Sequence, residues 1–130
     1  MKGGSSFDWP AIRSRAAMFP DEAFDFVREG LRHTAQTLHG GEEPTDLPDD
    51  RRHITGNQLC MGLRDFALRR YGLLAPTVLG RWQVRSTEDF GTLVYALIDR
   101  GELRASERDS IEDFKGVYEF GEAFRAVGIG

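Results

Sequence analysis

Three histidines and one cysteine are the side chains of this chain most able to bind a metal ion: His33, His39, His53 and Cys60. Structural zinc sites hold such ligands at short spacings, as in CxxC or HxxxH motifs. Neither motif occurs in the sequence, and the step from His33 to His39 places the two rings on different faces of a continuous helix. The spacing therefore predicts no metal site, and we expect no cofactor.

Cys60 and His53 could also act together as a nucleophile and its base. Cys60 lies near the start of a predicted helix, a position that can lower the pKa of a thiol. It also lies on the apolar side of that helix, where a small buried thiol is the ordinary expectation. No oxyanion-hole motif accompanies the pair. A small enzyme that uses Cys60 or a buried carboxylate is therefore kept as a second alternative.

Carboxylates gather near the C-terminus, at Asp109, Glu112 and Asp113 and again at Glu119 and Glu122. General acid–base chemistry would require one of them to be buried with a raised pKa. Carboxylates before turns and helices more often cap backbone N–H groups or face water. We expect these five to be caps or solvated side chains.

Residues 75–105 indicate another kind of chemistry, the recognition of a macromolecule. A short helix that Pro76 starts is followed by a turn and by a second helix, over residues 86–100, that Ser86 caps and Gly101 ends. A strand near residues 103–105 would follow. This order is typical of a helix-turn-helix, and a two-stranded wing between residues 103 and 118 would make it winged-helix-like.

The charges of this segment disfavour DNA. The outward positions of the second helix are expected to be Glu88, Asp89, Thr92, Ala96 and Asp99, and residues 86–100 carry a net charge of −2. Carboxylates near phosphates oppose binding. The first hypothesis is therefore a non-enzymatic protein-interaction or adaptor domain, with a nucleic-acid-binding regulator as the alternative. The candidate interaction surface is Arg81, Arg85, Tyr95, Arg100 and Arg104.

Helical periodicity runs through most of the chain and predicts a mainly α fold, a compact domain of about five or six helices. The helices are expected over residues 9–19, 21–38, 55–71, 76–82, 86–100 and 120–127. The broad apolar sector around Leu63 predicts that the 55–71 helix is central. Four glycines within helices predict close helix packing with little room for a small-molecule pocket: Gly30, Gly62, Gly80 and Gly91.

The composition is that of a single domain over residues 1–130. The chain is 40% hydrophobic with a net charge of −4, so it can build a core and exerts no general attraction on polyanions. Residues 1–6 are expected to be a flexible lead-in, and residues 40–52 a flexible acidic loop. One cysteine, no signal peptide and no apolar run of membrane-spanning length predict a cytoplasmic protein without a membrane partner.

Several motifs of the chain resemble a known family, the uncharacterised bacterial repeat family described from the Planctomycetes and Verrucomicrobia. They are HITGNQLC at 53–60, YGLLA at 71–75, STEDFG at 86–91, DF at 113–114 and YEFGEAF at 118–124. The resemblance implies a compact single domain with no assigned activity, and it supplies no catalytic residues.

Overall fold

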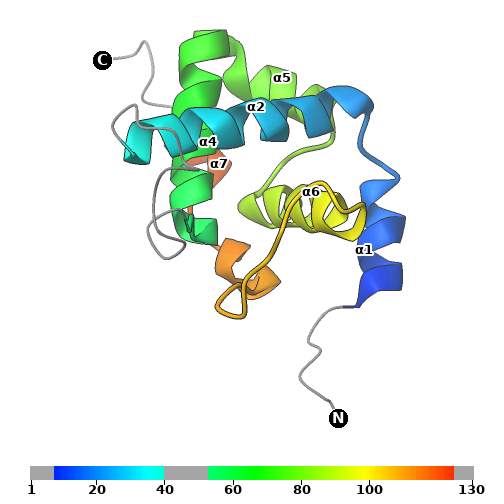
Figure 1. Cartoon of the computed structure of the whole chain (residues 1–130). Coiled ribbons are helices and arrows are strands. Elements are labelled where there is room, and N and C mark those ends of the chain that lie inside the picture. The colour runs from blue at the N-terminus through cyan, green and yellow to red at the C-terminus, as the bar shows by residue number, and fades with distance from the viewer. Residues whose placement is uncertain (1–7, 40–52, 125–130) are drawn as a thin grey trace.

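The computed structural model describes residues 8–39 and 53–124, and within these ranges it is mainly helical, as predicted (Figure 1). The α-helices are α1 (Trp9–Ala16), α2 (Asp21–Leu38), α4 (Gly56–Tyr71), α5 (Ala75–Arg81), α6 (Thr87–Asp99) and α7 (Phe120–Ala123). Two 3₁₀ helices are η2 (Gly72–Leu74) and η3 (Ile111–Phe114). The predicted lead-in and acidic loop lie outside the described residues, as does the end of the predicted 120–127 helix.

The helix ends follow the local signals in the sequence. Thr55 accepts a hydrogen bond from the backbone N–H of Gln58 at 3.0 Å, and Gln58 accepts one from the N–H of Thr55 at 2.9 Å. This capping box satisfies N–H groups that have no partner within α4. Ser86 caps α6 in the predicted way. Gly72 and Gly101 follow α4 and α6 with positive φ angles of 55° and 80°, which glycine adopts without strain.

The most enclosed of these helices is α6, not α4. Ten of its 13 residues are buried, against five of the 16 residues of α4. Figure 1 shows the reason: α6 lies in the middle of the molecule, in contact with α1, α2, α4 and η3. The 55–71 helix, α4, contacts α2, α5, α6, η2 and η3, as its broad apolar sector predicted, so α4 and α6 share the central position. The small residues Thr92 and Ala96 allow neighbouring elements to cover the face that was expected to be outward.

Glycines bring α2 and α4 close together, as predicted. A Cβ atom at Gly62 would overlap the side chain of Thr34, and one at Gly30 would overlap Leu63. Gly91 does the same for α6 and η3, because its Cβ would lie 2.8 Å from the Cβ of Phe114. Gly80 has no neighbour within 4 Å of a Cβ, so close packing is not its role.

The wing predicted between residues 103 and 118 is not formed. These residues hold turns and η3, without a strand. Side-chain caps explain the difference: Asp109 Oδ2 accepts a 2.7 Å hydrogen bond from the N–H of Ser106, and Asp113 Oδ2 accepts a 3.2 Å bond from the N–H of Ser110. Each bond closes a tight turn, which competes with the extended backbone of a hairpin.

Candidate functional site

The predicted interaction surface does not form one surface. Tyr95 is only 1% exposed, so its predicted place on this surface is wrong. Arg85 and Arg100 flank opposite ends of α6, a helix of 13 residues and therefore about 20 Å long. Arg85 Nη1 donates to Gln83 at 2.6 Å, and the Arg100 guanidinium lies 4.2 Å from the centroid of the Phe24 ring. Arg81, the last residue of α5, and Arg104, in the loop after α6, are exposed.

The packing of α6 also removes the face that a recognition helix needs. Of the predicted outward positions, Asp89, Thr92 and Ala96 are 6%, 5% and 4% exposed, and only Glu88 and Asp99 face solvent. A helix that reads a DNA groove must offer several exposed side chains to base edges. In this structure α6 offers two carboxylates.

Asp89 is the kind of buried carboxylate that an acid–base enzyme could use, but its oxygens are committed to structure. Oδ1 accepts a 2.8 Å hydrogen bond from Arg15 Nη2, and Oδ2 accepts one of the same length from the N–H of Arg85. These contacts tie α1 and the turn before α6 to the start of α6. Asp89 is therefore a structural cap.

Cys60 is unsuited to nucleophilic chemistry. It is fully buried, and burial together with the charge of Glu88 raises the pKa of its thiol to about 12. The thiolate that would attack a substrate is then scarce at neutral pH. The buried thiol that the apolar side of the helix predicted is confirmed.

The histidines do not meet at a metal site. His33 Nε2 lies 2.7 Å from Asp65 Oδ2, and His53 Nε2 lies 3.1 Å from Asp109 Oδ1. Within the described ranges no group of three or more histidine, cysteine, aspartate or glutamate side chains could hold a metal ion.

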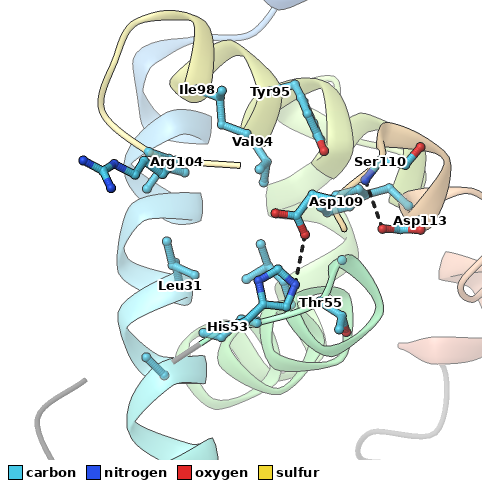
Figure 2. Close-up of a pocket in the computed structure, with 16 residues that line it drawn as sticks. Leu31, His53, Thr55, Val94, Tyr95, Ile98, Arg104, Asp109, Ser110 and Asp113 are labelled. Atoms are coloured by element: carbon cyan, nitrogen blue, oxygen red, sulfur yellow. Dashed lines mark hydrogen bonds and ion pairs between the residues drawn. The ribbon is translucent and has the colours of Figure 1, made fainter. Parts of the chain in front are cut away.

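A cavity of about 310 Å³ lies beside the His53–Asp109 pair, between α2, α4, the C-terminal half of α6 and η3 (Figure 2). Most of its walls are apolar and come from all of these elements: Leu31, Ala35, Ile54, Leu59, Val94, Ile98, Leu103 and Phe114. The prediction of little room for a small-molecule pocket is therefore wrong. The glycines close α2 on α4 and α6 on η3 locally, and the cavity lies where these four elements diverge.

The polar wall of the cavity is built from segments far apart in the sequence. Figure 2 shows Asp109 between Tyr95, which reaches down from α6, and His53, which precedes α4. The side chains of His53 and Asp109 are only 16% and 17% exposed. Because Asp109 also accepts from the N–H of Ser106, its carboxylate is fixed in place from two sides. Asp113 lines the same cavity from η3.

The pKa of Tyr95 is influenced by the carboxylates of this wall. Burial, followed by the charges of Asp109 and Asp113, raises the pKa of its phenol to about 12. Both carboxylates are thus close enough to influence the hydroxyl, which stays protonated at neutral pH. Tyr95 is a lining residue of the cavity rather than part of an outer surface.

The sequence analysis named His53, Asp109 and Asp113 separately but did not predict that they line one cavity. His53 was considered as a ligand or base, and Asp109 and Asp113 as caps. The cap role of both aspartates is confirmed. The pairing of His53 with Asp109 crosses 56 positions of sequence, and no local pattern encodes it.

A second hollow, of about 360 Å³, lies between α2 and α4 beside the His33–Asp65 pair. Its rim includes the exposed side chains of Leu38 and Met61. The His53–Asp109 cavity is the stronger candidate site, because four elements enclose it and several polar side chains converge on it.

No protein-family model, curated protein sequence or solved structure matches the chain. The family resemblance of the motifs therefore stays a prediction, and the functional argument rests on the cavity.

Proposed function

We propose that this chain is a non-enzymatic protein-interaction domain that receives a side chain of its partner, with a largely apolar stem, in the His53–Asp109 cavity. The observation that carries the proposal is the cavity itself, about 310 Å³ with mainly aliphatic and aromatic walls. Binding sites for small groups are typically concave and apolar, with a few polar side chains that fix orientation. The polar wall of His53, Asp109 and Asp113 matches that description.

Binding is favoured over catalysis because the polar groups of the wall are engaged in holding the fold. Ser110 Oγ accepts from the N–H of Glu112 at 3.1 Å, and Thr55 Oγ1 accepts from the N–H of Gln58. Asp109 and Asp113 accept from backbone N–H groups as well. A catalytic centre would instead aim a nucleophile at a base that a third group orients.

A membrane partner receives no support from the helices. Across residues 8–39 and 53–124, no helix combines the length and apolar character needed to cross a bilayer. The predicted cytoplasmic location remains a prediction.

The proposal can be tested with hexan-1-ol, a probe that has an apolar chain and one neutral polar end. We expect saturable amide chemical-shift changes in the ¹⁵N-labelled protein at Val94, Ile98 and Phe114. A ligand of seven heavy atoms should bind with a Kd on the order of 1 mM. Absence of saturable changes at these residues would overturn the proposal.

A matched pair of variants separates cavity binding from general adhesion. Ala35 lines the cavity and is partly exposed on α2, so Ala35→Phe should fill the space and abolish binding. Ala11 is exposed on α1 and lies outside the cavity, so Ala11→Phe should leave binding unchanged. Equal binding by both variants would place the probe elsewhere.

A further inference from the structure

The charged groups around the cavity are unevenly placed. Asp109 and Asp113 line it from the same side, and Tyr95 lies close to both carboxylates. Even a protonated His53 would offset only one of the two negative charges. Arg104 also lines the cavity, but its guanidinium extends outward, on the far side from Asp109 (Figure 2). The inner wall therefore keeps an excess of negative charge in a largely apolar setting.

An anion would find no corresponding attraction at the start of α4. The first turn of a helix attracts anions through its N–H groups and its dipole. In α4 the capping box already uses the N–H of Gln58. Asp113 also packs closely against this helix end, because a Cβ at Gly56 would lie 2.8 Å from the Asp113 Cβ. Asp113 of η3 is thus a close neighbour of this helix end.

We propose that the group received by the cavity is an alkylammonium, such as the side chain of a lysine presented by a partner protein. This inference rests on the proposed function and specifies its ligand. The four-carbon stem of lysine suits the apolar walls formed by residues such as Leu31 and Ile98, and the ammonium suits the Asp109–Asp113 side. Buried or half-buried carboxylates attract a cation more strongly than exposed ones, because water screens them less.

An ammonium fits the remaining acceptor sites better than a guanidinium. Asp109 Oδ1 already faces His53 Nε2, and its Oδ2 accepts from Ser106 N–H. Asp113 Oδ2 accepts from Ser110 N–H. The flat fork of arginine needs two free oxygens of one carboxylate in a fixed arrangement, whereas the three donors of an ammonium rotate to reach separate lone pairs.

The test compares three probes with the same six-carbon chain: hexylamine, hexan-1-ol and hexanoate, each titrated at pH 7 into the ¹⁵N-labelled protein. We expect hexylamine to bind about tenfold more tightly than hexan-1-ol, and hexanoate to bind most weakly. Equal affinities of amine and alcohol would overturn this inference and leave the proposed function intact. Failure of all three to bind would overturn both.

Variants then locate the charge that is responsible. Asp113→Asn keeps an oxygen that can accept from Ser110 but removes the charge, so the preference for amine over alcohol should fall to about twofold. Glu112→Gln is the control, because Glu112 is an exposed neighbour that pairs with Lys115, and it should retain the tenfold preference. Equal loss in both variants would mean that general surface charge is responsible.

Two further probes distinguish the source of the ammonium. Nα-acetyl-lysinamide carries the lysine side chain without charged termini, and Nα-acetyl-argininamide is its guanidinium counterpart. A lysine side chain of a partner predicts that the first binds at the cavity and the second binds several-fold more weakly. Binding of hexylamine but not of the lysine amide would indicate a free amine and overturn the assignment to a protein partner. The wild-type comparisons decide these points even if Asp113→Asn fails to fold.

Discussion

The two ends of α6 use the same device for different results. At its start, Asp89 accepts from the N–H of Arg85 and pairs with Arg15 of α1. Beyond its end, Asp109 accepts from the N–H of Ser106 and pairs with His53. Each aspartate closes a turn and ties a distant segment to it. The side chain of Asp89, however, is 8% exposed beside a hollow of about 210 Å³, whereas that of Asp109 is 17% exposed and lines the mainly apolar cavity of about 310 Å³.

The difference teaches where function can be sought in a helical domain without catalytic motifs. A carboxylate that its own chain covers almost completely and that holds a guanidinium contributes to stability. A carboxylate held in the same way beside open, apolar space is also available to a ligand. Substitutions at the more deeply buried Asp89 should therefore change the free energy of unfolding most, and those at Asp109, beside the larger apolar cavity, should change binding most.

The largest effect is expected for Asp89→Ala. The variant loses two hydrogen bonds, both of them charge-assisted, and leaves the Arg85 N–H without its acceptor, so the free energy of unfolding should fall by about 2–3 kcal/mol. Urea denaturation followed by circular dichroism measures this change. Glu88→Ala is the matched control, since Glu88 is exposed in the same turn, and should cost about 0.5 kcal/mol. Equal costs would mean that the start of α6 is not held by Asp89.

The second effect concerns the contact that closes α6 on η3. A Cβ at Gly91 would meet Phe114 at 2.8 Å, so Gly91→Ala should lower the free energy of unfolding by about 2 kcal/mol through overpacking. Gly80→Ala, at a helix position without near neighbours, should instead stabilise the protein by about 0.5 kcal/mol. Denaturant titration of both variants checks the contrast in sign. A loss at Gly80 as large as that at Gly91 would contradict it.

Local chemistry explains how much of this could be predicted. The caps at Thr55 and Ser86 and the stops at Gly72 and Gly101 depend on residues within one turn, and the structure confirms them. The closure of α2 on α4 at Gly62 was also correct, because only glycine permits so short an approach.

The rest depended on contacts that join distant segments. Periodicity marked Thr92 and Ala96 as outward, although small side chains can be covered from either face, and four elements surround α6. Periodicity also led to the prediction that Tyr95 lies on a surface. The cavity forms only where α2, α4, α6 and η3 come together. The spacing of residues along the chain does not predict its His53–Asp109 pair.

A third prediction uses the raised pKa of Tyr95, about 12. An unfolded tyrosine releases its proton near pH 10, whereas folded Tyr95 retains it, so the folded state binds more protons between pH 10 and 12. The contribution of Tyr95 to stability is therefore complete below pH 10 and is lost as the pH rises towards 12. In Tyr95→Phe the unfolding free energy should decline less steeply with pH over this interval, by the slope that corresponds to about one bound proton.

Urea denaturation at several pH values between 9 and 12 measures that slope. Cys60 and Tyr118 have raised pKa values as well, so wild-type protein and variant share their contributions and the difference isolates Tyr95. Parallel curves for the two proteins would show that neither burial nor the carboxylates of the cavity wall raise the pKa of the phenol.

The smallest effect on stability, and the sharpest test of the comparison, is expected for Asp109→Ala. Its carboxylate is more exposed than that of Asp89 and caps a turn rather than a long helix, so its loss should cost about 1 kcal/mol.

For binding, the order of the two positions should be the opposite. The affinity for hexylamine should fall about tenfold in Asp109→Ala and stay unchanged in Asp89→Asn. If the Asp89 substitution weakened amine binding as much, the ends of α6 would not be separate in function. If Asp109→Ala cost as much stability as Asp89→Ala with binding intact, Asp109 would be structural too. Only a crossed pattern, stability at one end and binding at the other, is consistent with a cavity held ready for a ligand.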